Sequence, residues 1–465
     1  MPELHTGAPA RTVGPAGWID VVGCAHTGTR RVPAFLVSPS PRTPGGERGM
    51  IRHRITRGLD VPVEGAPVQT VENAPPVGAV ALLGRDVRGA RPRLRVEPGQ
   101  TVRLGQVLFE DRDRPEIVFT SPGAGVVRAV HRGERRALAS VVVALEGDAE
   151  ETFPSFPRAA LAGLARDEVV RALLASGLFP ALRARPYGTV PDPASVPRSL
   201  FVTATASDPL AARPDVVIAS DPQAFADGLA VLSRLTPGPV FLCRAPDAVV
   251  PEGDPARVRV ATFAGPHPSG LVGTHVHRLD PVRAGGSVWH VGYQDAIAIG
   301  ALFTTGRLRP DRVVALGGPG VARPRLLRTR LGASLDDLVR GQLADGPHRV
   351  VSGSALSGDV AVGERAFLGR HHTQVTVLAP EPEERHRPDR PVMPPLPVYA
   401  RVVPLDLLVV PLLRALLVGD FERAEALGAL ELEEEDLALC SYVCPGRITY
   451  GPLLRTALDA LQEAR

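Results

Sequence analysis

Residues 96–109 read VEPGQTVRLGQVLF, and residues 117–130 read IVFTSPGAGVVRAV. Both stretches consist of short apolar runs separated by glycine, proline and other turn residues. This spacing is typical of short antiparallel strands in a β sandwich or barrel. The sequence therefore predicts a small β domain around these two stretches.

The same residues fit the pattern V-x-x-G-x-x-V-x-x-G-Q-x-L followed by S-P-x-x-G-x-V, which resembles the biotinyl/lipoyl hammerhead family. In that family a modified lysine lies at the tip of a tight hairpin between the two halves. The connecting segment here, residues 111–115, reads DRDRP and has no lysine. We therefore predict that the fold is kept and that swinging-arm chemistry is absent.

The composition excludes several further classes of protein. All 53 residues in the Lys-plus-Arg count are arginine, which excludes a Schiff-base lysine and a P-loop lysine. The formal charge of +3 is too small for nucleic-acid binding by bulk charge.

No stretch approaches the roughly 20 apolar residues of a membrane span. Four cysteines in 465 residues do not form a disulfide framework, so we expect a reducing, cytosolic location.

The first 49 residues differ from the rest of the chain. They are rich in Gly, Pro, Ser, Thr and Arg and have little periodic apolar pattern. Arg30 and Arg31 precede an apolar run that ends after Val37, which is shorter than the apolar core of an export signal. We predict a disordered tail or a non-native extension upstream of a natural start at Met50.

Strands and helices alternate over residues 165–330, as expected for a central α/β layer. Helical apolar spacing marks residues 165–184 and 224–235. Buried strands are predicted at residues 200–204, 216–219, 240–243, 258–263 and 313–316.

Two glycine-rich stretches lie in this layer. In residues 265–277, Gly270 and Gly273 would let backbone amides approach an anion at a helix start. His275 and His277 share one face if the chain is extended there, but no third or fourth metal ligand is evident, so we favour hydrogen-bonded histidines. The second stretch, VVALGGPG at residues 313–320, is out of register with a dinucleotide-binding motif, and we predict a turn.

Residues 349–465 divide into a predicted β module, a predicted linker and predicted helices. Residues 349–378 suit a small β-grasp-like or hairpin module, and residues 379–397 read as an exposed linker rich in Pro, Glu, Arg and Asp. Helices are predicted at residues 405–418 and 421–427. The acidic run at residues 431–436 suits the first turn of another helix, and we interpret it as a solvated face.

Cys440 and Cys444 match the end of the ferredoxin signature C-x2-C-x2-C-x3-C-P. The two upstream positions of that signature hold Leu437 and Glu434, so this motif cannot ligate an intact cubane cluster. We predict two buried thiols at a helix start.

Taken together, these segments resemble the NqrA family, which comprises one of the subunits of Na+-translocating NADH:quinone reductases. The resemblance extends over residues 50–465. It is carried by ITRGLDVPVEGAP (55–67), GQVLFED (105–111), VWHVGYQD (288–295), RTRLGAS (328–334) and LCSYVCPG (439–446).

The resemblance implies a peripheral subunit on the cytoplasmic side of a six-subunit membrane complex. That complex passes electrons from NADH through flavins and iron centres to ubiquinone and exports Na+. The implied partners of this chain are the five other subunits, including membrane subunits and a flavin/ferredoxin-type subunit. Ubiquinone is the implied substrate, with no nucleic acid and no membrane span of the chain's own.

The resemblance also relates the chain to RnfC and to the flavin subunit of complex I, in which a loop of the type S-G-L-R-G-R-G-G-A-G-F-P holds flavin. The corresponding residues 176–188 read SGLFPALRARPYG, so most loop glycines are replaced by residues whose side chains block a flavin. We therefore expect a subunit that binds no cofactor or metal and has no catalytic residue of its own. If the vacated cleft takes the quinone head group, Arg183, Arg185 and Tyr187 would donate hydrogen bonds to its carbonyls.

The predicted fold class is α/β multidomain, with a hammerhead-like β barrel-sandwich, a central Rossmann-like α/β layer, a small β-grasp-like module and C-terminal helices. The predicted divisions are 1–49 (tail), 50–150 (β domain), 151–335 (Rossmann-like), 336–380 (β-grasp-like, SLBB-type), 381–400 (linker) and 401–465 (helices). Two alternatives stay open: an RnfC-like electron-transfer subunit with flavin and iron–sulfur clusters, and a non-redox scaffold.

Overall fold

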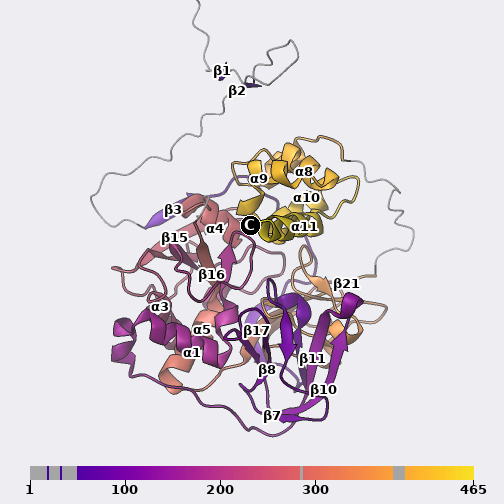
Figure 1. Ribbon diagram of the computed structural model, residues 1–465. Coiled ribbons are helices and arrows are strands. Elements are labelled where there is room, and N and C mark those ends of the chain that lie inside the picture. Colours follow the sequence, from indigo (N-terminus) through magenta and orange to yellow (C-terminus); the bar gives the residue numbers. More distant parts are fainter. Residues whose placement is uncertain (1–17, 20–31, 34–49, 283–285, 381–392) are drawn as a thin grey trace, which may run out of the picture. The chain divides into compact units, whose positions relative to one another are not determined.

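The computed structural model describes residues 18–19, 32–33, 50–282, 286–380 and 393–465. The chain forms two compact units, residues 1–49 and 50–465. In the first unit β1 (Trp18–Ile19) pairs antiparallel with β2 (Val32–Pro33). The second unit holds all the other described elements (Figure 1). Cys24, most of the predicted tail and most of the predicted linker lie outside the described residues.

The predicted β domain consists of two antiparallel sheets. Its strands are β5 (Ala79–Leu83), β6 (Pro92–Leu94), β7 (Thr101–Val102), β8 (Val107–Asp111), β9 (Val118–Thr120), β10 (Gly125–Arg132) and β11 (Leu138–Leu145). The sheet orders are β5-β11-β10-β7 and β6-β8-β9. Val127 and Val143 of the first sheet join the same buried cluster as Phe109 and Phe119 of the second. The two sheets therefore share one core, as the alternation of apolar and turn residues predicts.

A six-stranded sheet forms the central layer. Its strands are β3 (Ile51–Arg54), β12 (Arg183–Arg185), β13 (Ser199–Ala204), β14 (Val240–Arg244), β15 (Val258–Ala264) and β16 (Val288–Gly292). Their order is β12-β16-β13-β14-β15-β3, and every neighbouring pair is parallel except β12 with β16.

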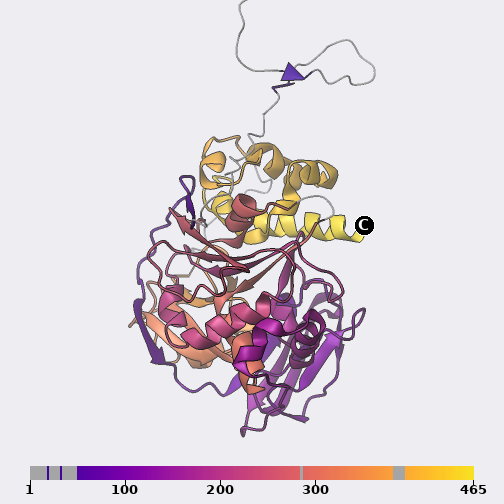
Figure 2. The ribbon, with the colours of Figure 1, turned by 90° about the vertical axis from the view of Figure 1, so that its left-hand side faces the viewer.

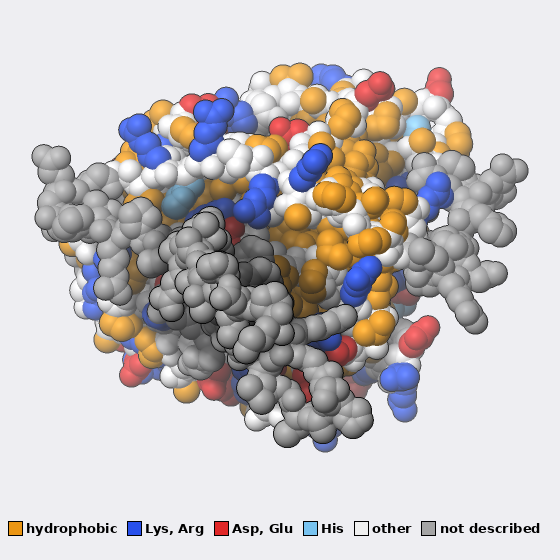
Figure 3. All heavy atoms as spheres, turned by 90° about the horizontal axis from the view of Figure 1, so that it is seen from above, with side chains coloured by type: hydrophobic (Ala, Val, Ile, Leu, Met, Phe, Trp, Pro, Cys, Tyr) orange, Lys and Arg blue, Asp and Glu red, His pale blue; other side chains and the backbone are white. Residues whose placement is uncertain are grey.

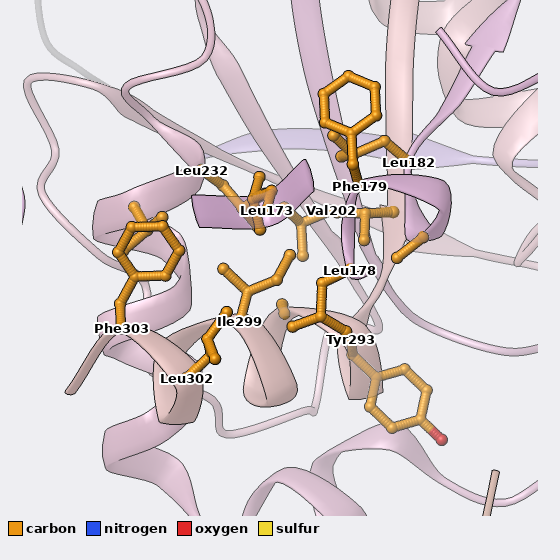
Figure 4. Packing of buried hydrophobic residues seen from close by; sticks show 14 of the residues in the cluster. Leu173, Leu178, Phe179, Leu182, Val202, Leu232, Tyr293, Ile299, Leu302 and Phe303 are labelled. Carbon is orange, nitrogen blue, oxygen red and sulfur yellow. The ribbon is translucent and has the colours of Figure 1, made fainter. Parts of the chain in front are cut away.

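Helices cover both faces of this sheet (Figure 2). They are α1 (Arg166–Ser176), α2 (Pro214–Ile218), α3 (Pro222–Leu232), α4 (Val272–Leu279) and α5 (Tyr293–Thr305). Val202 of β13 packs in the cluster of α1, α3 and α5, whereas its neighbour Phe201 packs in the cluster of α4. In Figure 4, Leu173 of α1, Val202 and Ile299 of α5 lie side by side. Burial on both faces explains why β13 reads as a continuous apolar run.

Two predictions in this layer are wrong. The predicted strand at residues 216–219 lies in α2, because Pro214 starts a helix well at its first position and a four-residue apolar run does not distinguish a strand from a helix. The helix predicted over 165–184 ends at Ser176, where Gly177 takes a left-handed conformation with φ of 71°. Residues 183–185 are strand β12 instead.

A second, mixed sheet has the order β20-β19-β21-β17-β18-β4. Its strands are β4 (Val68–Asn73), β17 (Asp311–Gly317), β18 (Arg325–Arg330), β19 (Arg349–Ser352), β20 (Asp359–Val360) and β21 (Gln374–Leu378), and the short helix α6 (Leu335–Val339) lies between β18 and β19 in the chain. The predicted strand at 313–316 lies in β17 and so belongs to this sheet, not to the parallel one. The turn predicted after it is present, with Gly318 at a φ of 112°.

The C-terminal helices lie together in the ribbon (Figure 1), and their apolar side chains form a separate buried cluster. They are α7 (Val398–Val402), α8 (Val409–Val418), α9 (Phe421–Ala426), α10 (Ala438–Tyr442) and α11 (Tyr450–Glu463). The two predicted helices correspond to α8 and α9, although α8 begins later than predicted. Cys440 and Cys444 are buried in this cluster, as predicted. The predicted position at a helix start is wrong, since Cys440 lies within α10 and Cys444 follows its end.

Candidate functional site

The parallel sheet places a cleft at the carboxyl ends of β13 and β16. From β13 the chain moves outward through β14 and β15 and then returns to the other side of β13 as β16. Ligands of open α/β sheets bind at such a reversal of strand order. A cavity of about 180 Å³ lies there, and it is lined by Thr203 of β13, Gly292 and Tyr293 at the start of α5, and Gly270 before α4.

An acidic segment of the C-terminal part, Glu433–Asp436, enters this region and meets two arginines of β12. Glu433 lies 3.3 Å from Arg183 and 3.1 Å from Arg185, and Asp436 lies 3.1 Å from Arg185. The Arg185 side chain is 0% exposed, and those of Glu433 and Asp436 are 2% and 1% exposed. His290 of β16 adds a contact of 3.4 Å to Glu433. These residues form a buried ionic cluster that joins the C-terminal helices to the sheet.

Asp436 also occupies the start of α4. A Cβ added at Gly273 would lie 2.2 Å from Asp436 Oδ1, so only glycine lets the carboxylate reach this turn. The positive end of a helix favours an anion. The sequence predicts an anion at Gly270 and Gly273, and the chain supplies a carboxylate of its own next to Gly273.

Glu433 and Glu435 have pKa values that are shifted in opposite directions. Burial by itself would raise the pKa of Glu433, but Arg185 and Arg183 lower it well below its ordinary value. Burial, together with Glu433 and Asp436, raises the pKa of Glu435 to about 8. Glu433 is therefore ionised at neutral pH, while Glu435 mostly keeps its proton.

The interpretation of the acidic run as a solvated face is wrong. Glu433 and Asp436 are both buried, and both face arginines some 250 positions earlier in the chain. A charge run looks solvated in the sequence because its partners are remote. The ion pairs offset the cost of removing these charges from water.

The structure brings together two of the three residues predicted to bind quinone. Arg183 and Arg185 share Glu433, and Arg183 also lines the cavity at the sheet edge. Tyr187 lies apart from them and packs against the C-terminal cluster. Its backbone carbonyl accepts a hydrogen bond of 2.7 Å from Arg455.

The loop at residues 176–188 is filled by its own side chains. Phe179 and Leu182 are 0% exposed and point into the core in Figure 4. Phe179 also packs edge-on against Trp289, with ring centroids 6.0 Å apart. Phe179 and Leu182 of this loop are therefore part of the hydrophobic core.

His275 and His277 lie in helix α4, not in an extended segment as the shared-face argument assumes. His275 Nε2 donates to the Ser269 carbonyl at 3.0 Å, and His277 Nδ1 lies 2.7 Å from Glu431. Both are hydrogen-bonded, as predicted. Across residues 50–282, 286–380 and 393–465, no group of three or more His, Cys, Asp or Glu side chains is placed to hold a metal ion.

Sequence analysis missed His371 and the special position of Glu435. Both line the cavity at the sheet edge and a second cavity of about 510 Å³ beside it. His371 precedes β21, which lies in the other sheet, so neither spacing nor a motif connects it to β12. The acidic run was visible in the sequence, but nothing in it distinguishes Glu435 from its neighbours.

The raised pKa of Glu435 predicts a pH-dependent stability. The ordinary value is 4.5 and the folded value is about 8, so the unfolding free energy decreases as pH rises through this window. Glu435→Gln is expected to be more stable than the wild type at pH 8 by about 1 kcal/mol, a small value because water in the two cavities screens the charge. At pH 4 the two proteins are expected to have the same stability.

Urea unfolding of both proteins across this pH range measures the difference. The exposed Glu422 of α9 provides the control, since Glu422→Gln is expected to leave the pH dependence unchanged. Equal stabilities of Glu435→Gln and the wild type at pH 8 would contradict the prediction.

Comparison with known proteins finds three family domains along the chain. Residues 53–146 match the NqrA N-terminal barrel-sandwich hybrid domain, residues 164–308 the NqrA second alpha/beta domain, and residues 313–362 the NQRA C-terminal domain. Among the described residues, no helix has both the length and the apolar character needed to cross a bilayer.

Several curated proteins are similar along almost their whole length. The NqrA protein of Serratia proteamaculans, a component of its Na(+)-translocating NADH-quinone reductase, is 49% identical over 446 residues, which are 88% of this chain and 99% of the relative. The NqrA proteins of Pseudomonas aeruginosa and Cellvibrio japonicus are 49% and 48% identical, with the same coverage. A solved NAD+-reducing [NiFe]-hydrogenase aligns with 17% identity and a TM-score of 0.39, over 66% of this chain and 65% of the hydrogenase chain.

Proposed function

This chain belongs to the NqrA family, and we propose that it serves as the NqrA component of a Na+-translocating NADH:ubiquinone reductase. One observation carries the proposal: relatives with that role in their names are 49% identical over 99% of their own length. The proposed complex passes electrons from NADH through flavins and iron centres to ubiquinone, forms ubiquinol and exports Na+. This chain is a peripheral subunit on the cytoplasmic side, with five other subunits as partners.

Copurification tests this assignment. The chain is tagged at its C-terminus in its own organism, and membranes are solubilised gently. Recovery with five partners, among them multi-span proteins and a flavin/ferredoxin-type NADH dehydrogenase subunit, is expected. Recovery of the chain alone from the soluble fraction would favour the non-redox scaffold.

The proposal also states that this subunit binds no flavin or iron–sulfur cluster. Support comes from the cleft, because the carboxylates of Glu433 and Asp436 occupy the region where an anionic cofactor would need positive charge. Phe179 and Leu182 fill the core below the loop. The purified chain is expected to lack flavin absorbance and the broad band near 400 nm of iron–sulfur proteins; either band would favour the RnfC-like alternative.

For the quinone head group we propose the cavities beside Arg183. This arginine lines both of them and can donate hydrogen bonds to a quinone carbonyl. Arg185 lines neither cavity and pairs with Glu433 and Asp436, and Tyr187 packs against the C-terminal cluster. Photo-labelling with an azidoquinone is expected to mark residues 176–188, and labels found only elsewhere would exclude this site.

The domain division predicted from the sequence is part of the same proposal. The Rossmann-like description of residues 151–335 is supported over residues 199–305, where parallel strands carry helices on both faces. Residues 311–330 form β17 and β18 of the other sheet. The β-grasp-like description of residues 336–380 is supported by the pairing of β19 with β20 and β21. For residues 1–49, 50–150, 381–400 and 401–465 we propose the assignments that the sequence predicts, namely tail, β domain, linker and helical domain. Within residues 50–150, β3 and β4 pair with strands of the other two sheets.

The C-terminal helices provide the surface on which we propose that the membrane subunits dock. Every residue of α8 except Arg414 is apolar, and five of its ten residues are buried in the C-terminal cluster. Leu408, Val418 and Tyr442 are 51%, 79% and 55% exposed. Seen from above, hydrophobic side chains gather over this end of the molecule (Figure 3). Exposed apolar patches of this kind mark interaction sites.

The double variant Leu408→Glu/Val418→Glu is expected to reduce recovery of the membrane partners at least about tenfold, because two charges would be buried in the interface. The same copurification measures it. Val249→Glu is the matched control, since Val249 is 88% exposed outside the C-terminal helices, and its recovery is expected to equal that of the wild type. Normal assembly of the double variant would place docking on another surface.

A further inference from the structure

The two cavities beside β12 share a wall that consists of ionisable side chains. The larger, of about 510 Å³, is bounded by the acidic segment and by Arg455 of α11. The smaller, of about 180 Å³, lies at the carboxyl edge of the parallel sheet. Four residues line both cavities: Arg183, His371, His372 and Glu435. Any proton that crosses between the cavities meets this wall.

The side chains of two of the four residues have an ion-pair or hydrogen-bond partner, and the other two side chains have none among the described residues. Arg183 pairs with Glu433 at 3.3 Å, and His372 Nδ1 lies 2.9 Å from Ser352 Oγ. Within the parts of the chain that the structure describes, neither the Glu435 side chain nor the His371 side chain has a hydrogen bond or an ion pair. Their polar atoms are therefore available to a ligand or to water in either cavity.

The charges around Glu435 explain why it carries a proton. The groups that face it are the carboxylates of Glu433 and Asp436 and the guanidinium groups of Arg185 and Arg183. Both arginines are already paired with those two carboxylates. Glu435 is the third carboxyl group, left without a cation, so the neutral acid is its stable form near neutral pH.

His371 has the opposite surroundings. Burial lowers its pKa well below the ordinary value, and the guanidinium groups of Arg183, Arg370 and Arg88 lower it further. The imidazole is therefore neutral and has a free lone pair. The protonated carboxyl group of Glu435 and the neutral imidazole of His371 thus lie on one wall. The carboxyl group can donate a proton and the imidazole can accept one, so neither group has to change its charge first.

We propose that Glu435, with His371 on the same wall, delivers the protons that quinone takes up on reduction; this inference rests on the proposed binding of quinone beside Arg183. Reduction to quinol takes two electrons, which come from NADH through the partner subunits, and two protons. In each protonation the O–H bond of the Glu435 carboxyl group breaks and an O–H bond forms on a quinone oxygen. A proton from solvent in the other cavity then binds one ring nitrogen of His371, and the proton on the other ring nitrogen passes to the Glu435 carboxylate.

The test uses the intact complex with Glu435→Gln, Glu435→Asp and the control Glu422→Gln. Glu435→Gln is expected to lower the rate of ubiquinone reduction at pH 7 by about 100-fold, the usual contribution of a positioned acid. Glu435→Asp keeps a carboxyl group and is expected to stay within about tenfold of the wild type. NADH oxidation with ferricyanide, which bypasses quinone, is expected to be unchanged in all three variants.

The pH profile separates proton delivery from a structural role. The wild-type rate is expected to fall above about pH 8, where Glu435 ionises, and this limb is expected to be missing in Glu435→Gln. A wild-type rate and an unchanged profile in Glu435→Gln, with azidoquinone still labelling this chain, would overturn proton delivery alone. Absence of the label from this chain in the wild-type complex would overturn the quinone site as well.

Discussion

Replacing Arg185 with methionine is expected to lower the unfolding free energy by about 3–5 kcal/mol. The guanidinium group is fully buried, and it lies 3.1 Å from Glu433 and 3.1 Å from Asp436. Methionine has a similar length but no charge. The variant leaves carboxylates with too few cations in a region that excludes water, and an uncompensated buried charge costs more than the pair contributes.

Urea unfolding of the purified chain measures this loss. Arg171→Met is the matched control, because Arg171 is exposed on α1, and its effect is expected to stay within about 0.5 kcal/mol. The triple variant Arg185→Met/Glu433→Gln/Asp436→Asn removes both carboxylates together with the cation and is expected to recover more than half of the lost stability. If Arg185→Met were as stable as the control, the cluster would not connect the C-terminal helices to the sheet.

Gly300→Ala is expected to lower the unfolding free energy by about 2–3 kcal/mol, although alanine is the better helix former by about 1 kcal/mol. The backbones of α3 and α5 touch at this position. A Cβ at Gly300 would lie 1.9 Å from the Ala224 carbonyl oxygen and 2.5 Å from the Gly228 nitrogen. Because both obstacles are backbone atoms, the two helices must separate, and contacts between Phe225, Leu229 and Ile299 loosen.

The same substitution at an open position provides the comparison. A Cβ added at Gly163 would meet nothing within 4 Å, so Gly163→Ala is expected to be neutral or slightly stabilising. Thermal and urea unfolding of the two variants measure the difference. Equal stability of Gly300→Ala and Gly163→Ala would mean that α3 and α5 do not pack as closely as described.

Local patterns predicted the elements that depend on local chemistry. The alternation of apolar and turn residues around Val96 to Val130 predicted the antiparallel strands, and the run at residues 200–204 predicted β13. Predictions from local patterns were wrong where contacts between distant parts of the chain determine the structure. Residues 216–219 are helical because Pro214 starts a helix there, and the acidic run is buried because the C-terminal helices bring it to β12.

The candidate site shows the same division. Arg183 and Arg185 were found through a loop resemblance, but their carboxylate partners lie some 250 residues away in the chain. His371 comes from a different sheet and carries no motif. No short-range pattern contains information about which of several neighbouring carboxyl groups is left without a cation.

The sequence predicted the β domain, the alternating α/β layer and the helical C-terminal part, because these follow from the local spacing of apolar residues. It also predicted the NqrA family, because long segments resemble the sequences of that family. The pairing of Glu433 and Asp436 with Arg185, the proton on Glu435 and the ionisable wall between two cavities became evident only in the folded chain. The charge state of a buried group depends on its burial and on charges within a few ångströms. Those neighbours are brought together by the fold from distant parts of the chain.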